Sequence, residues 1–338
     1  MSPQLLLPIE DRSHIGDARR AASNLAIRLQ FDETLIGKVT LAVTELGTNI
    51  VKHAGTGRLL LRELSGGGAA GVEVLALDKG PGIADVSASL RDGHSTTGTM
   101  GSGLGAISRL SDEFEIYTQP GKGLALRAVI WGGGPGGRPP SVEYGGICVA
   151  KRGEPVAGDD WSVATDRGFV SVLLADGLGH GLHAHEAARA ARDTLAAHPE
   201  AEPEALVQAC HAALARTRGA ALAVARLAPN AERGSFAGVG NIVGRVEGST
   251  ANRHLASYNG TVGHNLHRIR EFAFPWPTGA LLVMHSDGLG THWDLAAYPG
   301  LSARHPALIA GVLYRDYDRG RDDVSVVVLR NRGSDAGS

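Results

Sequence analysis

The sequence predicts an α+β protein of two domains, and two observations lead to this prediction. Helix-like and strand-like segments follow a different order in the two halves of the 338-residue chain. Between the halves, residues 132–140 combine glycine and proline at a density that holds neither a helix nor an interior strand. We therefore expect domains at residues 1–131 and 141–331, a linker at 132–140 and a disordered polar tail at 332–338. The alternative to a linker is a long surface loop within one domain, which is uncommon in compact folds.

In the first half, two helices are expected before most of the strands. Apolar residues recur at helical spacing across residues 15–29 and 35–50. Strand-like runs follow at Arg58–Leu64, Val72–Leu77, Glu113–Thr118 and Leu124–Trp131. Because this order is not a regular βαβ alternation, we expect an antiparallel or mixed sheet with helices on one face.

The second half is richer in strand-like runs. They are expected at Gly146–Ala150, Phe169–Ala175, Ala221–Leu227, Val239–Val246, Ala280–His285 and Val324–Leu329. Two alanine-rich helices are expected among them, near His183–Ala197 and Pro203–Thr217. Strands distributed around helices in this way favour a β-sandwich flanked by helices.

Charge and composition argue against several functional classes. The net charge is −2, so no global basic field attracts nucleic acid or an anionic membrane, and we expect neither as a partner. Cys148 and Cys210 are the two cysteines, too few for a disulfide framework or a cysteine zinc site, and a reducing cytoplasm is the simplest compartment. The leucine run at residues 5–7 is too short for a signal peptide, and no apolar run approaches the roughly 20 residues that cross a bilayer.

Two motifs of the first half indicate a nucleotide site. Glu45 and Asn49 lie one helical turn apart, where a carboxylate and an amide can hold Mg²⁺ and activate a hydroxyl; a solvated polar stripe is the alternative. Asp78 follows a strand, where it can accept a hydrogen bond from an exocyclic amine such as that of adenine. Gly80 and Gly82 would let the backbone approach the ligand, although an isolated motif of this kind is an ordinary turn.

A third motif is a glycine-rich stretch that leads into a helix-like segment. Its glycines are Gly101, Gly103 and Gly105, and glycine-rich backbone at a helix N-terminus cradles phosphates. The stretch also matches the G-x-G-x-x-A dinucleotide fingerprint. That interpretation is disfavoured because the polar residues 91–99, rather than a strand, precede the stretch.

In this order the three motifs resemble the N box, the D-x-G-x-G box and the second glycine box of the GHKL ATPase superfamily. Residues 10–131 are most similar to its RsbT-like serine kinases and anti-sigma-factor kinases. The resemblance implies an α/β sandwich that binds Mg·ATP, with Asn49 as a Mg²⁺ ligand and Glu45 as the general base. It implies that Asp78 reads adenine, that the glycines at 101, 103 and 105 hold the phosphates, and that a homodimer forms in related modules.

Acidic motifs beside apolar runs mark the second half. They contain Asp159, Asp176, Asp287 and Asp322 at expected strand ends, where carboxylates far apart in sequence can converge. Four carboxylates brought together would repel one another and raise their pKa values unless cations were bound. Hard divalent cations prefer oxygen ligands, and a pair of them roughly 3.5–4 Å apart can generate hydroxide and clamp a phosphoryl group. The pattern therefore predicts a metal-dependent phosphatase.

The same motifs resemble those of PPM-type, SpoIIE-like and RsbX-like protein serine phosphatases across residues 141–331. The resemblance implies that Asp159, Asp176, Asp287 and Asp322 are metal ligands and that Gly177 offers its carbonyl. Asp176 would bridge two Mn²⁺ or Mg²⁺ ions; the roles of Asp160 and Asp323 stay open. A zinc site at His180, His183 and His185 is disfavoured, since their spacing matches no zinc motif.

Taken together, the two resemblances imply a bifunctional regulator of a bacterial partner-switching pathway. The first domain would phosphorylate a STAS-domain protein from ATP, and the second would dephosphorylate a phosphoserine or phosphothreonine on such a protein. The alternative is a phosphatase that is gated by an ATP-sensing or partner-binding first domain without transfer.

Overall fold

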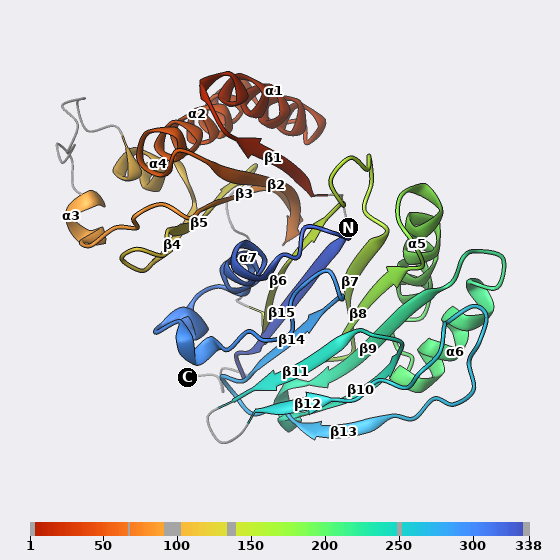
Figure 1. Cartoon of the computed structure of the whole chain (residues 1–338). Coiled ribbons are helices and arrows are strands. Elements are labelled where there is room, and N and C mark those ends of the chain that lie inside the picture. Colours follow the sequence, from red (N-terminus) through yellow and green to blue (C-terminus); the bar gives the residue numbers. More distant parts are fainter. Residues whose placement is uncertain (1–3, 67, 91–102, 134–139, 249–251, 334–338) are drawn as a thin grey trace. The chain divides into compact units, whose positions relative to one another are not determined.

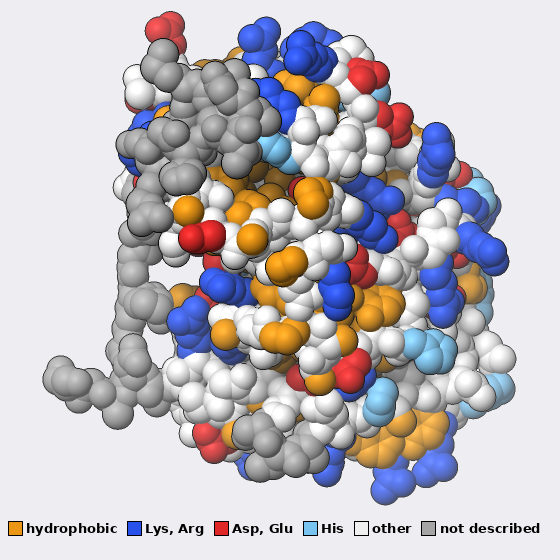
Figure 2. All heavy atoms as spheres, turned by 60° about the vertical axis from the view of Figure 1, so that its left-hand side comes forward, with side chains coloured by type: hydrophobic (Ala, Val, Ile, Leu, Met, Phe, Trp, Pro, Cys, Tyr) orange, Lys and Arg blue, Asp and Glu red, His pale blue; other side chains and the backbone are white. Residues whose placement is uncertain are grey.

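The structure of the protein is a computed structural model that describes residues 4–66, 68–90, 103–133, 140–248 and 252–333. The chain divides into two compact units, one of residues 2–138 and the other beginning at residue 139. Most of the predicted linker, residues 134–139, and most of the predicted tail, residues 334–338, lie outside the described residues, as does Gly101. Each unit is drawn as a ribbon in Figure 1, and Figure 2 shows all heavy atoms with the described side chains coloured by type.

The first unit is a five-stranded antiparallel sheet with helices on one face (Figure 1). The strand order is β1-β2-β3-β5-β4, and every neighbouring pair runs antiparallel, the first of the two predicted alternatives. In chain order its elements are β1 (Leu5–Ile9), α1 (Arg12–Arg28), α2 (Glu33–Asn49), a π-helical turn (Ile50–Ala54), β2 (Gly57–Gly66), β3 (Ala69–Asp78), α3 (Val86–Leu90), α4 (Leu104–Leu110), β4 (Glu113–Thr118) and β5 (Leu124–Trp131).

Helix caps and an apolar stripe explain the α1–α2 layer. The Asp11 carboxylate accepts a hydrogen bond from the Ser13 amide at the start of α1, and the Asp32 carboxylate accepts one from the Leu35 amide at the start of α2. The buried side of each helix joins one core with the facing side of the sheet. Strand β1 was missed, because its leucine run was considered only as a possible leader; it pairs with β2.

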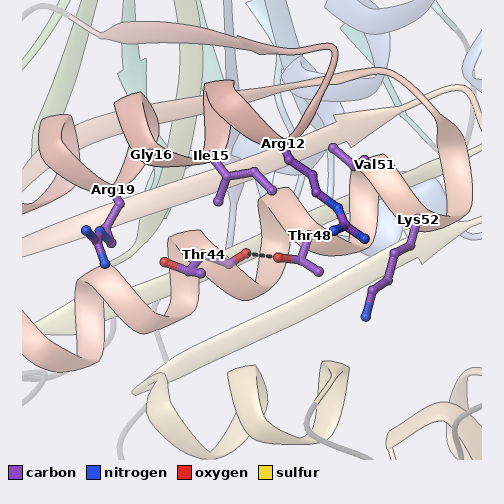
Figure 3. A pocket seen from close by; sticks show the side chains of 8 residues that line it. All are labelled: Arg12, Ile15, Gly16, Arg19, Thr44, Thr48, Val51 and Lys52. Atoms are coloured by element: carbon purple, nitrogen blue, oxygen red, sulfur yellow. Dashed lines mark hydrogen bonds between the residues drawn. The ribbon is translucent and has the colours of Figure 1, made fainter. Parts of the chain in front are cut away.

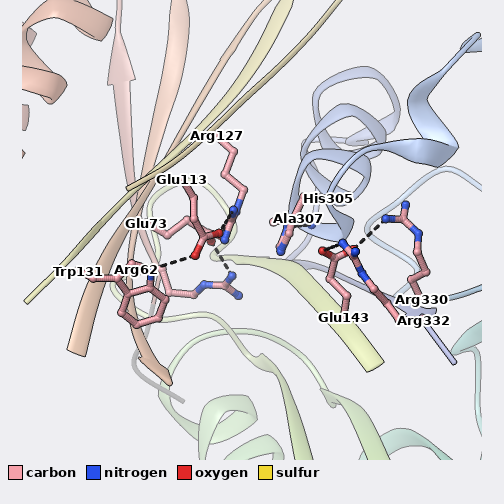
Figure 4. A network of polar contacts seen from close by, with 10 residues as sticks. All are labelled: Arg62, Glu73, Glu113, Arg127, Trp131, Glu143, His305, Ala307, Arg330 and Arg332. Atoms are coloured by element: carbon pink, nitrogen blue, oxygen red, sulfur yellow. Dashed lines mark hydrogen bonds and ion pairs between the residues drawn. The ribbon is translucent and has the colours of Figure 1, made fainter. Parts of the chain in front are cut away.

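The opposite face of this sheet carries buried ion pairs (Figure 4). Glu73 on β3 lies between Arg62 on β2 and Arg127 on β5, at nitrogen–oxygen distances of 2.5 and 2.6 Å. Arg127 also contacts Glu113, which accepts a hydrogen bond from the Trp131 indole. Glu73 is 1% exposed, so each charge in this row depends on its partners.

The second unit is a sandwich of two five-stranded sheets (Figure 1). The sheet orders are β13-β10-β9-β8-β7 and β12-β11-β14-β15-β6. Its elements are β6 (Val142–Val149), β7 (Asp159–Asp166), β8 (Phe169–Gly177), α5 (Leu182–Ala197), α6 (Pro203–Ala213), β9 (Ala220–Ala228), β10 (Arg233–Val239), β11 (Val243–Glu247), β12 (Arg253–Leu255), β13 (Phe272–Pro275), β14 (Leu281–His285), α7 (Pro306–Tyr317) and β15 (Val324–Asn331).

Helices flank this sandwich, as predicted. One core lies between the two sheets, and a second lies between the β7–β10 sheet and helices α5 and α6. Helix α7 packs against β6 and β15 of the other sheet, where a Cβ on Gly145 would lie 2.5 Å from the Ala307 amide nitrogen. Sequence periodicity did not find α7, because its turns are apolar all round rather than amphipathic.

One strand prediction is wrong in a way that matters for the site. The run Val239–Val246 is not a single strand: β10 ends at Val239 and β11 begins at Val243 in the other sheet. The chain changes sheets at Gly240, whose φ of 93° is one that glycine adopts without strain. The turn places Asn241 beside the acidic motifs. None of the helices in the described ranges is long and apolar enough to cross a bilayer.

Candidate functional site

The acidic motifs of the second unit meet at one edge of the sandwich. Asp159 begins β7 and Asp176 lies near the end of β8, and the antiparallel register places these two residues directly opposite each other. Asp287 follows the end of β14, and Asp322 lies two residues before β15, the neighbouring strand of the other sheet. Strand ends from both sheets thus bring the predicted ligand residues together.

Electrostatics shows that these carboxylates interact. Burial raises the pKa of Asp159 well above its ordinary value, and the neighbouring Asp176 carboxylate raises it further. Burial also raises the pKa of Asp176 to about 7, with Asp287 and Asp322 contributing in the same direction. Without bound metal, the fold therefore holds these carboxylates close together and away from water, which disfavours their ionised form.

The donor set fits hard divalent cations. Asp159 is 2% exposed, and no described residue forms a hydrogen bond with its buried Oδ2 atom. An unpaired buried carboxylate oxygen is costly, and a cation is the partner that such an oxygen prefers. Across the described ranges, no three Asp, Glu, His or Cys side chains are already close enough to enclose one ion. In the described structure these carboxylates thus lie near one another but do not form a closed coordination shell.

Glycines allow the backbone to pass through this cluster. A Cβ on Gly177 would lie 2.1 Å from the Ala184 carbonyl oxygen, so the end of β8 packs directly on the first turn of α5. The Gly177 amide donates to the Gly158 carbonyl at 3.1 Å, which joins the loop before β7 to the end of β8. A side chain at Gly177 would push the predicted carbonyl ligand out of line.

Asp323 and Asp160 have separate roles from the facing carboxylates. The buried Asp323 carboxylate accepts hydrogen bonds from the Lys151 amide at 2.7 Å and the Gly158 amide at 2.9 Å. It therefore holds the loop that delivers Asp159. Asp160 instead pairs with Arg192 on α5 at 2.8 Å and accepts a hydrogen bond from the Trp161 amide.

Two supporting residues had no assigned role in the sequence. Asn241 donates its side-chain amide to Asp287 Oδ2 at 2.6 Å, which orients that carboxylate. His285 is buried, bonds through Nδ1 to the Ser286 carbonyl, and accepts a hydrogen bond from the Trp293 indole. Burial lowers the His285 pKa to about 4, so a neutral ring supports the turn that carries Asp287. The Gly238-Val239-Gly240-Asn241 motif could have pointed to Asn241, whereas no local pattern in the sequence points to His285.

In the first unit, Glu45 and Asn49 lie on the last turns of α2. Among the described residues, the buried Asn49 amide nitrogen has no hydrogen-bond partner, so this donor could contact an acceptor oxygen of a ligand. Beyond Asn49 the helix widens into the π-helical turn 50–54, and such turns occur frequently at functional sites. A Cβ on Gly80 would lie 2.8 Å from the Ala54 Cβ, so this turn packs on the loop after β3.

Asp78 ends β3 and is held by that loop. Its Oδ1 atom accepts hydrogen bonds from the Gly80 amide at 2.8 Å and the Leu124 amide at 3.3 Å. Gly82 has a φ of 72°, and a Cβ there would lie 2.4 Å from the Gln119 carbonyl oxygen. Both loop glycines thus meet protein rather than open space, which differs from the expected approach to a ligand.

The glycine-rich stretch is described only from Gly103 onward. Gly103 precedes α4, and no atom of the described residues lies within 4 Å of a Cβ built on it. A Cβ on Gly105 would lie 2.7 Å from the Leu90 carbonyl oxygen, so this glycine allows α4 to pack on α3. Of the predicted phosphate-holding glycines, Gly103 is the one that the described structure leaves open.

Comparison with known proteins places both units in families. The model of the histidine kinase-like ATPase domain matches residues 8–130, and that of stage II sporulation protein E (SpoIIE) matches residues 166–332. The serine/threonine-protein kinase RsbT of Bacillus subtilis (strain 168) is 34% identical over 131 residues, which span 39% of this chain and 98% of RsbT. The chain joins an RsbT-family ATPase domain to a SpoIIE-family domain.

Solved structures agree with this assignment. A structure from work on "The bacterial stressosome: a modular system that has been adapted to control secondary messenger signaling" is 27% identical, with a TM-score of 0.53, and covers 56% of this chain and 99% of its own. RsbX in complex with magnesium is 19% identical, with a TM-score of 0.51, and covers 56% and 94%. At that identity the second similarity supports the fold alone.

In the RsbT-like domain, a groove lies between α1 and α2 (Figure 3). It encloses about 360 Å³ and is lined by Arg12, Ile15, Gly16, Arg19, Thr44, Thr48, Val51 and Lys52. Three cations and no carboxylate line it. Thr44 and Thr48 project into it, whereas the neighbouring Glu45 and Asn49 are not among its lining residues (Figure 3).

In the SpoIIE-family domain, the three histidines near α5 face different partners. His180 pairs with Glu154 at 2.5 Å and His183 pairs with Glu186 at 3.3 Å. His185 Nδ1 bonds to the Ala157 carbonyl at 3.0 Å. Each of these three imidazoles is thus engaged with a different partner.

Proposed function

We propose that this chain is a bifunctional regulator of a bacterial partner-switching pathway. Its SpoIIE-family domain would remove phosphate from a phosphoserine or phosphothreonine of a STAS-domain protein. Its RsbT-family domain would add phosphate to a STAS-type protein from Mg·ATP. The family assignment supports a signalling role, and RsbT itself bears the name of a serine/threonine-protein kinase. A cytoplasmic location and a homodimer are part of this proposal.

One observation supports the phosphatase half: mutually repelling carboxylates converge from both sheets, with Asp159 buried and Asp176 partly buried, and among the described residues Asp159 Oδ2 has no hydrogen-bond partner. Asp159, Asp176, Asp287, Asp322 and the Gly177 carbonyl would hold two Mn²⁺ or Mg²⁺ ions. When bound, such ions supply a hydroxide at neutral pH and neutralise a phosphoryl group. The chain's part is to fix the ligands, through Asn241 on Asp287 and Asp323 on the loop before Asp159.

The kinase half rests on α2 and the loop after β3. Glu45 would accept the proton of the attacking hydroxyl, and Asn49 would hold Mg²⁺ through its side-chain carbonyl oxygen. Asp78, oriented by two backbone amides, would accept a hydrogen bond from the adenine amino group. Gly103 would leave room for the phosphates before α4.

A second candidate is a phosphatase gated by an RsbT-like domain that binds ATP or a partner without transferring phosphate. Glycines Gly80, Gly82 and Gly105 all meet protein in the described structure, so their presence reflects packing as well as nucleotide binding. Glu45 distinguishes the two candidates. Under the transfer proposal, Glu45→Gln abolishes labelling of a STAS protein from γ-labelled ATP but preserves ATP binding.

The phosphatase is tested by Mn²⁺-dependent release of phosphate from a phosphoserine STAS protein. Wild type should release phosphate, and Asp176→Asn should reduce the rate at least 100-fold, since this residue is the proposed bridge between the metal ions. Asp166→Asn, at the far end of β7, serves as the matched control. Release that survives Asp176→Asn, or no release by wild type over several such substrates and metals, would overturn the assignment.

A further inference from the structure

We propose that Arg218 binds the substrate phosphate beside the metal cluster, an inference that rests on the phosphatase function proposed above. Arg218 lies in the loop between α6 and β9. A Cβ built on Gly179 would lie 2.9 Å from an Arg218 guanidinium nitrogen. Gly179 is three residues past Asp176, so this cation lies over the loop that leaves the acidic cluster.

The backbone fixes this position. Strands β8 and β9 pair with Gly177 opposite Ala220, so the residues that flank them, Leu178 and Gly219, are also neighbours. The Leu178 amide donates to the Gly219 carbonyl at 3.0 Å, which ties the arginine loop to the acidic loop. Arg218 thus starts from a strand end that adjoins the predicted carbonyl ligand.

The arginine loop is also held from its other side. The Thr217 hydroxyl donates a hydrogen bond to the Leu214 carbonyl at 2.8 Å and accepts one from the Gly219 amide at 3.0 Å. A ring nitrogen of His264 bonds to the Thr217 carbonyl at 2.9 Å. A loop restrained on both sides limits the region that the Arg218 guanidinium can sample, so less freedom is lost when an anion binds.

The charge of Arg218 is not already used. In the described part of the chain Arg218 is exposed and makes no ion pair, whereas Arg192 on α5 pairs with Asp160 and Asp193. A guanidinium offers a planar fork that matches two phosphate oxygens, and charge-assisted bonds of this kind are strong. The carboxylates and their ions would hold the phosphoryl group from one side while Arg218 holds its remaining oxygens.

Gly179 is part of the same arrangement. Its φ is 88°, and any side chain there would occupy the space that the guanidinium now fills. Glycine at this position therefore both permits the turn and leaves room for the arginine over it. The sequence alone gave no reason to connect residues 179 and 218.

The test compares Arg218→Ala and Arg218→Lys with Arg216→Ala, an exposed arginine of the same loop. On a phosphoserine STAS protein with Mn²⁺, Arg218→Ala should lower kcat/KM by about 10–100-fold, the value of one charge-assisted hydrogen bond. It should weaken competitive inhibition by inorganic phosphate to a similar extent, and the lysine variant should recover part of the loss. Arg216→Ala should match wild type.

Calorimetry distinguishes a failure of the Arg218 proposal from a failure of the proposed phosphatase function. Titration of Mn²⁺, and of inorganic phosphate into the Mn²⁺-loaded chain, should show unchanged metal affinity and weakened phosphate affinity in Arg218→Ala. Equal phosphate affinity in the two alanine variants overturns the Arg218 proposal while an active wild type leaves the phosphatase intact. Mn²⁺ affinity that falls together with activity also overturns it, since Arg218 would then merely support the acidic loop. A wild type without phosphatase activity refutes the proposed function instead, and the phosphate titration still decides Arg218.

Discussion

Replacing Asp176 by Asn should stabilise the metal-free protein while abolishing its response to metal. The pKa of Asp176 is raised from 3.8 to about 7, and a difference of one in pKa corresponds to about 1.4 kcal/mol. The penalty for ionising Asp176 in the folded state, which comes first from burial and then from the neighbouring carboxylates, is therefore ~4 kcal/mol at most at pH 8. Since the side chain is only partly buried, we expect a gain of ~2–4 kcal/mol in the free energy of unfolding.

The sign of the effect sets its pH dependence. The folded wild type keeps a proton on Asp176 up to about pH 7, whereas the unfolded chain releases it near 3.8. The destabilisation is therefore complete above pH 7, declines as the pH falls, and vanishes below about 4, where both states are neutral. The advantage of Asp176→Asn should disappear over the same interval.

Urea unfolding in EDTA, followed by tryptophan fluorescence, measures this difference. Trp161, Trp276 and Trp293 belong to the second unit, so the signal reports mainly on it. Asp166→Asn is the control and should unfold like wild type in EDTA. Excess Mn²⁺ should stabilise wild type and the control but not Asp176→Asn. Equal or lower metal-free stability of Asp176→Asn, or equal stabilisation by Mn²⁺, would refute the reasoning.

Three further outcomes are expected. Asn241→Ala should weaken Mn²⁺ binding about 10-fold by calorimetry, because Asp287 loses its 2.6 Å hydrogen bond; unchanged affinity would exclude this orienting role. Glu73→Ala should cost ~3–5 kcal/mol in urea unfolding, since it leaves Arg62 and Arg127 buried without their shared carboxylate, and a loss no larger than that of exposed Glu10→Ala would contradict this. Gly177→Ala should abolish Mn²⁺ binding by calorimetry, because its Cβ would meet the Ala184 carbonyl at 2.1 Å; a variant that binds Mn²⁺ normally would show that the loop yields without cost.

Local patterns predicted most of the fold. Strands β4 and β5 run from Glu113 to Thr118 and from Leu124 to Trp131, as the alternation in the sequence predicted. Local patterns failed where tertiary structure determines the strands. The run Val239–Val246 was predicted as one strand, but it divides between two sheets at Gly240. Helix α7 lacked amphipathic periodicity, and its apolar turns give no helical signal.

The candidate site likewise contains residues that the sequence predicted and residues that it did not. The acidic motifs were found because aspartates beside glycines at strand ends are conspicuous, and the structure brings them together. The sequence did not show which residues would become hydrogen-bond partners, because the bond from Asn241 to Asp287 joins residues far apart in sequence. Buried His285 resembles an ordinary strand residue until its ring is seen against Trp293. Such roles depend on contacts between segments far apart in sequence, which no local pattern fixes.

The most direct test of the central claim follows label from γ-³²P-ATP on a STAS-domain protein over time, with wild type, Glu45→Gln and Asp176→Asn. If one chain both adds and removes phosphate, wild type labels the protein transiently as ATP is consumed. Asp176→Asn should accumulate stable label, and Glu45→Gln should give none. The account is contradicted if Asp176→Asn never labels the protein, because transfer is then absent, or if wild type and Asp176→Asn retain equal label, because removal is then absent.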